Sequence, residues 1–254
     1  MRLKLNVRRE VKIGAVLLTL FALIAFTERM QAPATVSNIR ISILNIHENH
    51  FLEEKDIMRL MRLDEENLRG ADLSVLNFSE VENRIRESPY VQRAELFSDL
   101  KGNLMVNVTL RRPIARIVQS DGPDAYIGED GTIMPVSGKF AARVLLVSGE
   151  MAGKLIRLDN VNNSEVGRQL MDMVHMIKHD EFWNAQIAQI DINARGKAVM
   201  FPQVGDEHIE FGRPENLDAK FRKLKIFYKE ILPRVGWNKY DRVNVEYQGQ
   251  VVAE

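Results

Sequence analysis

The sequence predicts an α+β protein with an N-terminal transmembrane helix, a small domain in the order β-α-α-β-β, and a β-rich domain with two helices. Three observations support this prediction. A run of 14 uncharged residues, 13–26, follows a basic head. Next comes a segment that alternates like a strand, then two segments with apolar residues at helical spacing, then two more strand-like segments. After Pro113, short alternating segments are interrupted by two long helical patterns.

The uncharged run is short for a membrane span. As a helix its 14 residues reach about 21 Å, whereas a bilayer core of about 30 Å needs about 20 residues. Residues 11–30 provide 20 if Lys12 and Arg29 extend their charges to the two interfaces. We therefore expect a cytoplasmic head at residues 1–12 and a transmembrane anchor at residues 13–30. A cleaved signal peptide is the alternative, because residues 32–34 read Ala-Pro-Ala.

Charge predicts the orientation of this anchor. The first 12 residues carry five basic residues and one acidic residue, so the N-terminus is expected in the cytoplasm and the bulk of the chain outside it. The remainder holds 30 basic and 34 acidic residues. This slightly acidic balance disfavours binding of nucleic acid, because contacts to phosphates need a basic surface. The chain has no cysteine, which excludes disulfides, thiolate nucleophiles and Cys-ligated metals.

The first folded domain is expected at residues 37–112. Ile39, Ile41 and Ile43 alternate with polar residues, which predicts a strand. Helices are expected at about 52–61 and 79–88. The second has a capping box at Ser79 and Glu82 and ends before Pro89. Two strands follow, at 91–97 and 103–110, and both helices should cover one face of the sheet.

The second domain is expected at residues 113–254. Pro113 should mark a break or an edge position, because proline cannot donate to a strand ladder. Two helices are predicted at about 164–182 and 214–232, the latter with Pro214 as its first residue. Short strands are expected at residues 125–128, 132–136, 143–149, 187–192, 197–202 and 208–212.

Candidate chemistry is sparse. His175 and His179 are four residues apart on a predicted helix, as zinc ligands can be. They share a polar face with Arg168 and Asp172, so a solvated face is the better interpretation. His47 and His50 are interpreted as ordinary surface residues. The basic residues of the last helix are interpreted as its solvated face rather than as a lipid-binding patch; they are Lys220, Arg222, Lys223, Lys225 and Lys229.

The sequence closes on an unusual pair of strands. Val243, Val245 and Tyr247 alternate with polar residues, and a β-branched run follows Gly249. Residues 248–252 contain no charge and no proline, and proteins usually protect an exposed strand edge with one or the other. We therefore expect a partner to complete the edge by strand addition, although a frayed tail is the alternative. The predicted partner-binding residues are Tyr247 as an aromatic anchor, Gln248, Gly249 as the turn, and Gln250, Val251 and Val252 as the receiving edge.

The whole layout resembles the FtsQ/DivIB family of bacterial cell-division proteins, with a basic head, one anchor, a POTRA domain and a second β-rich domain. The most specific stretch is residues 87–117. Two departures occur: Arg111 and Arg112 stand where the family has an acidic residue, and the last residues, 251–254, lack an aromatic. The residues that carry the resemblance are Pro89, Tyr90, Val91, Leu104, Val106, Val108, Pro113, Ala115, Asp130 and Gly131.

The resemblance implies a non-enzymatic divisome scaffold of the cytoplasmic (inner) membrane at the division septum. It implies binding to the bitopic proteins FtsB and FtsL through the last strands and the helix before them, and regulation of septal peptidoglycan synthesis, with no cofactor. Two alternatives remain open from the residues themselves. One is an outer-membrane assembly factor with POTRA modules, and the other is an anchored periplasmic hydrolase or metalloprotein that uses His175 and His179.

Overall fold

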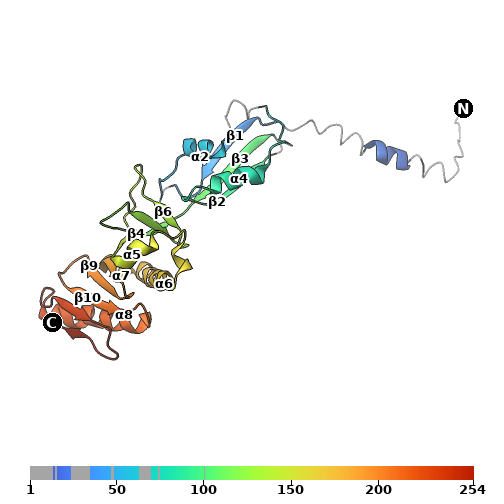
Figure 1. Ribbon diagram of the computed structural model, residues 1–254. Helices are drawn as coiled ribbons and strands as arrows, with labels where there is room; N and C mark the ends of the chain where they lie inside the picture. Colours follow the sequence, from blue (N-terminus) through green and yellow to red (C-terminus); the bar gives the residue numbers. More distant parts are fainter. Residues whose placement is uncertain are drawn as a thin grey trace, which may run out of the picture.

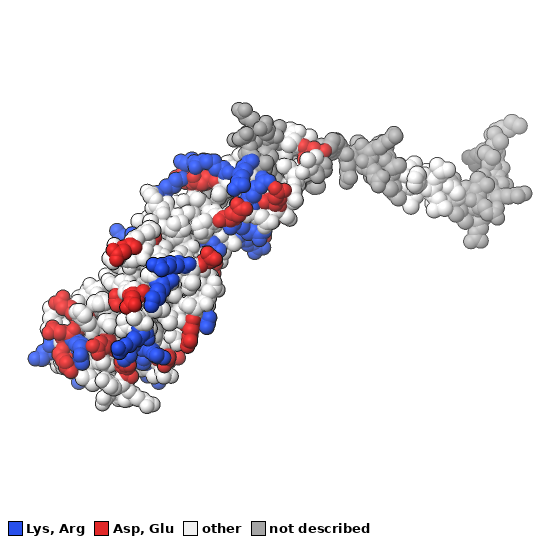
Figure 2. All heavy atoms as spheres, viewed as in Figure 1, with Lys and Arg blue, Asp and Glu red and all other residues white. Residues whose placement is uncertain are grey.

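The computed structural model describes residues 14, 16–23, 35–46, 49–62, 70–73, 75–99 and 101–254. Their fold is α+β as predicted, with a small three-stranded unit followed by a β-rich unit (Figure 1). None of the helices in these ranges is both long and apolar enough to cross a membrane. Half of the predicted anchor at 13–30 lies outside the described residues. On the face seen in Figure 2, acidic and basic side chains are intermixed.

The N-terminal unit has the predicted β-α-α-β-β order. Its elements are β1 (Asn38–Ile43), α2 (Glu54–Met61), α4 (Phe78–Arg86), β2 (Val91–Ser98) and β3 (Asn103–Leu110). Strand β3 lies in the middle, parallel to β1 and antiparallel to β2. Leu104, Val106, Val108 and Leu110 of β3 are buried together with Ile57 and Ile85 of the two helices, so both helices pack on one face of the sheet.

The start of α4 differs from the prediction. The helix begins at Phe78, and the Asn77 side chain accepts a hydrogen bond from the main-chain N–H of Glu80. Glu82 is therefore too far along the helix to reach back to its start, and the predicted capping box is wrong. Glu82 instead accepts a hydrogen bond from the main-chain N–H of Leu96 at 2.8 Å. This carboxylate ties α4 to β2.

The C-terminal unit contains one nine-stranded sheet. Its strands are β4 (Pro113–Ile117), β5 (Ala125–Gly128), β6 (Ile133–Pro135), β7 (Leu145–Ser148), β8 (Ile187–Ile192), β9 (Ala198–Pro202), β10 (His208–Gly212), β11 (Arg242–Asn244) and β12 (Val252–Ala253). Their spatial order is β12-β11-β10-β9-β8-β7-β4-β5-β6. Pro113 opens a strand inside the sheet, next to an irregularity in the β4–β5 pairing. Of the two predicted alternatives, a break or an edge position, the structure shows the break.

Helical segments of the C-terminal unit are α5 (Glu150–Leu155), η1 (Val161–Asn163), α6 (Glu165–His179), α7 (Glu181–Gln186), α8 (Leu217–Ile226), η2 (Phe227–Ile231) and α9 (Leu232–Val235). The helix predicted at 164–182 stops early because the Asp180 side chain accepts from the N–H groups of Phe182 and Trp183 and so begins α7. The last helix begins at Leu217, not at Pro214, because Asn216 adopts a left-handed conformation with φ 51°.

Aromatic rings join the two units. Phe51 and Tyr90 of the first unit stack with centroids 4.9 Å apart, and Phe51 meets Phe140 of the second edge-on at 5.1 Å. Tyr126 completes the cluster against Phe51. Phe51 and Tyr126 are each 1% exposed. These residues form a small core that is separate from the larger core of each unit and that holds the two units together.

Arg111 forms the polar part of the junction. Its guanidinium donates to the main-chain oxygens of Pro89 and Val91, each at 2.8 Å, and to the Asp130 carboxylate at 2.9 Å. The main-chain oxygen of Arg111 accepts from the buried side chain of Asn49 at 2.6 Å. Arg111, which departs from the family pattern, therefore pairs with an acidic residue in the turn of the other unit.

The junction should weaken in acid. Burial alone would raise the pKa of Asp56, but the hydrogen bond from Lys139 at 2.5 Å and the main-chain bond from Glu53 lower this pKa overall. A carboxyl whose pKa is lowered by folding stabilises the fold above its ordinary pKa of about 4, and that contribution is lost as the pH falls through the lowered value.

We therefore expect the free energy of unfolding to fall less steeply between pH 5 and pH 3 in Asp56→Asn than in the wild type. Urea unfolding at several pH values measures this slope. Asp121→Asn is the matched control, because Asp121 is exposed. Equal slopes for Asp56→Asn and the wild type would contradict the prediction.

Candidate partner-binding site

Strand β12 forms one edge of the nine-stranded sheet. It runs antiparallel to β11, with Val252 opposite Asn244 and Ala253 opposite Val243. Glu254 and Arg242 exchange two main-chain hydrogen bonds, at 2.9 and 3.1 Å. Because bonding alternates along an antiparallel ladder, Val252 directs its main-chain groups toward β11, whereas Val251 and Ala253 direct theirs away from the sheet.

The edge therefore differs in detail from the predicted one. Val251 lies just before β12, at a position that continues its outward-facing register, but the main chain of Val252 is used by β11, and the main-chain oxygen of Gln250 accepts from Lys223. Ala253, which sequence reasoning missed, contributes the second outward-facing pair of main-chain groups. Only the register of β11 and β12 shows which residues face outward, and the sequence pattern does not contain that register.

The turn before β12 is exposed. Gly249 has φ 75°, a left-handed conformation that glycine adopts freely. Tyr247 is 55% exposed and does not continue the strand as its spacing predicted. The side chain of Asn244 accepts from the main-chain N–H of Glu246 at 2.8 Å, and such an Asx turn bends the chain out of the ladder. Gln248 lies beside Gly249 and is also exposed.

Lys223 of α8 holds this turn in place. Its ammonium donates to the main-chain oxygens of Val245 at 2.9 Å, Gln250 at 3.3 Å and Tyr247. Lys220, which is 8% exposed, donates to the main-chain oxygens of Phe211 and Arg213. Burial lowers the pKa of both lysines. The interpretation of the basic run as a solvated face is therefore wrong for these two residues, because their stems pack inward and their charges meet carbonyls.

A cavity of about 570 Å³ lies between α8 and the turn. Arg222 lines it from the helix, and Tyr247, Gln248 and Gly249 line it from the turn. Glu246 also lines the cavity from the turn, and its carboxylate forms an ion pair with Lys197 at 2.8 Å. Three of the predicted partner-binding residues thus surround one cavity, and the outward edge of β12 follows them along the chain.

The chain was compared with known families. A profile of the POTRA-like domain matches residues 34–109. A second profile, described as FtsQ/DivIB, C-terminal related, matches residues 112–254, which is more than half of the chain. The chain belongs to the FtsQ/DivIB family. A search of curated proteins gave no match.

FtsQ/DivIB proteins are non-enzymatic scaffolds of cell division that act through interactions with other division proteins. This membership favours a cell-division role over the outer-membrane assembly factor that the POTRA domain alone left open. The candidate site, from α8 to β12, lies within the FtsQ/DivIB-related match.

His175 and His179 are a poor candidate metal site in this FtsQ/DivIB protein. The rings of His175 and His179 are 5.9 Å apart, and His179 Nδ1 donates to the main-chain oxygen of His175 at 2.7 Å. Within the described ranges, no group of three or more His, Asp or Glu residues could hold a metal ion. His50 packs edge-on against Phe140 at the domain junction, and His47 lies outside the described residues.

We expect Lys223→Met to loosen the turn while leaving the sheet folded. The substitution keeps the apolar stem but removes hydrogen bonds from a charged group, whose loss costs on the order of 1–3 kcal/mol. Amide exchange of residues 246–250 should become faster. Lys229→Met is the control, because Lys229 is exposed on the adjoining segment η2 and no main-chain hydrogen bond of its ammonium to a described residue is seen. Unchanged exchange in Lys223→Met would show that Lys223 does not hold the turn.

Proposed function

We propose that this protein is a divisome scaffold that binds FtsB- and FtsL-like bitopic proteins and thereby helps to control septal peptidoglycan synthesis. The observation that carries this proposal is the outward edge of β12 beside the cavity at α8, within the region that matches the FtsQ/DivIB family. The FtsB-like partner adds a strand to this edge.

Strand addition suits the chemistry of this edge. Val251, Val252 and Ala253 carry no charge and no proline, the two devices that most often protect an edge from pairing. The outward N–H and C=O groups of Val251 and Ala253 supply main-chain hydrogen bonds, and neighbouring pockets give such interfaces their specificity. The cavity at α8 and the exposed ring of Tyr247 supply that second element.

The proposal places the protein in the cytoplasmic membrane, with residues 1–12 in the cytoplasm and the folded units outside. The basic head and the apolar run support this orientation. Mass spectrometry of the protein from its own membranes should find a mature start at or near Met1. A start near Thr35 would instead indicate a cleaved signal peptide.

Co-purification tests the proposed function. Full-length protein is co-expressed with FtsB- and FtsL-like proteins, and the captured partners are quantified for the wild type and for a variant that lacks residues 249–254. We expect the wild type to capture both partners and the deletion to lose the FtsB-like partner. Val136→Ser is the control, because Val136 adjoins β6 at the opposite edge of the same sheet and is 40% exposed. Equal capture by the wild type and the deletion would contradict the proposal.

A further inference from the structure

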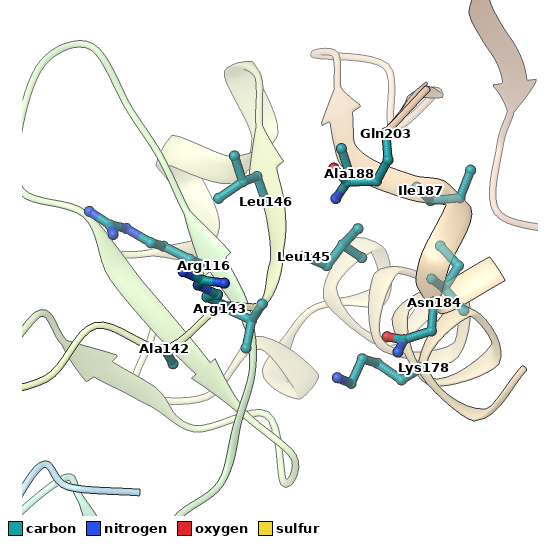
Figure 3. Close-up of a pocket in the computed structure, with 12 residues that line it drawn as sticks. Arg116, Ala142, Arg143, Leu145, Leu146, Lys178, Asn184, Ile187, Ala188 and Gln203 are labelled. Atoms are coloured by element: carbon teal, nitrogen blue, oxygen red, sulfur yellow. The ribbon is translucent and has the colours of Figure 1, made fainter. Parts of the chain in front are cut away.

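The nine-stranded sheet splits only at one end of the β7–β8 pair, because three of the four residues of β7 pair with β8. These two strands pair in parallel only where Leu146–Ser148 meets Gln189–Asp191. Before that point, β7 stays paired with β4 at Leu145, and β8 stays paired with β9 at Ile187. A cleft of about 500 Å³ lies at the split, bounded by β4, β7, the end of α6, α7 and the start of β8 (Figure 3).

Every charged side chain that lines the cleft is cationic. Arg116 and Arg143 lie on the side of β4 and β7, and Lys178 lies across from them on α6 (Figure 3). No carboxylate lines the cleft. Arg116 is already paired with Asp124 at 2.6 Å. Arg143 and Lys178 have neither a hydrogen bond nor an ion pair from their side chains to any residue that the structure describes.

The rest of the lining is apolar apart from two amides. Leu146, 37% exposed, is an accessible apolar wall, with the buried Ile177 and Ile187 behind the lining, whereas Asn184 and Gln203 supply hydrogen-bonding groups. Next to the cleft, Arg143 and Val144 lie outside the strands, and their main-chain groups bond to no other main-chain group of the described residues. The cleft thus combines unpaired cations, apolar walls and free main-chain groups.

We propose that this cleft is a second docking site, which binds an extended acidic peptide segment that carries apolar side chains between Asp or Glu residues. The carboxylates meet Arg143 and Lys178, the apolar side chains contact Leu146, and the peptide main chain pairs with that of Arg143 and Val144. A small inorganic anion would use the cations alone and leave the apolar walls uncovered, so the mixed lining favours a peptide.

The cleft is separate from the candidate site at β12. Five inter-strand steps separate β7 from β12 in the sheet order, which is about 24 Å at the usual strand spacing. A partner strand at β12 and a peptide in the cleft can therefore be bound at the same time. This inference does not depend on the function proposed for β12.

A peptide selection tests the proposal. Random heptapeptides displayed on phage are selected on the full-length protein in detergent micelles, and the composition of the selected peptides is compared with that of the starting library. We expect enrichment of Asp and Glu alternating with Leu, Ile or Val. The enrichment should disappear with the double variant Arg143→Gln/Lys178→Gln. Neither side chain has a partner to lose, so this variant should fold normally.

Affinity measurements complete the test. The synthetic consensus peptide should bind the wild type about three- to tenfold more tightly than it binds Arg143→Gln/Lys178→Gln, and the difference should shrink in high salt. The control Arg157→Gln/Lys239→Gln removes the same charge from two exposed positions outside the cleft and should bind like the wild type. Selection of peptides without acidic residues, or equal affinity for the cleft variant, would overturn the proposal. Tighter binding of inorganic phosphate or of phosphatidylglycerol vesicles than of the peptide would also overturn it.

Discussion

Replacing Arg111 with methionine is expected to lower the free energy of unfolding by about 2–4 kcal/mol. The Arg111 side chain is 15% exposed and makes hydrogen bonds to three partners that its charge strengthens. A single bond of this kind contributes on the order of 1.5–3 kcal/mol, and bonds made by one side chain are not additive, so the total stays well below three times that value. The contribution of Asp130 is the smallest, because its side chain is 36% exposed and water replaces part of the pairing. Urea unfolding of the wild type and the variant measures the difference.

The same substitution should loosen the two units relative to each other. Because the chain has no native cysteine, spin labels can be attached at Ser79→Cys and Asp218→Cys, which lie on exposed positions of the two units. The distribution of distances between the labels should be broader in Arg111→Met than in the wild type. Arg157→Met is the control, since Arg157 is exposed and far from the junction in sequence. A stability within 0.5 kcal/mol of the wild type and an unchanged distribution would contradict the role given to Arg111.

Replacing Ala253 with proline is expected to weaken binding of the FtsB-like partner at least tenfold with little loss of stability. Ala253 directs its N–H outward, so proline removes a donor to the incoming strand while the pairing of β12 with β11 is kept. Proline is tolerated at such an edge position because its missing donor faces solvent in the free protein.

Two readouts separate this effect from misfolding. Thermal unfolding should give nearly the same midpoint for Ala253→Pro and the wild type, and calorimetric titration with the partner should show the weaker binding. Ala253→Ser is the matched control, because it keeps the N–H and should bind normally. Equal affinity of Ala253→Pro and the wild type would mean that this donor has no part in binding.

Local patterns predicted most of the secondary structure. The alternation of Leu104, Val106 and Val108 identified a strand with one buried face, and the structure buries all three side chains. The helical spacing of Leu170, Val174 and Ile177 likewise predicted the buried face of α6. Such patterns succeed because burial of one face repeats with the geometry of the element itself.

The errors arose where a side chain bonds far along the sequence. The spacing of Ser79 and Glu82 predicts a helix cap, but Glu82 binds the main chain of β2. The basic run of the last helix predicts a solvated Lys223, but Lys223 binds carbonyls of a turn more than 20 residues later. The cleft between β7 and β8 was missed because Arg143 and Lys178 belong to different elements and share no spacing pattern. Only the packed fold brings these residues together.

Amide exchange at β12 tests the central claim most directly. Nuclear magnetic resonance of the full-length protein in micelles can follow the N–H groups of Val251, Val252 and Ala253 with and without the FtsB-like partner. In the free protein, the amide of Val252 should exchange slowly because it bonds to β11, and those of Val251 and Ala253 should exchange fast. If the partner adds a strand, the amides of Val251 and Ala253 should become slow on binding. Fast exchange at both residues in the saturated complex would contradict strand addition at this edge.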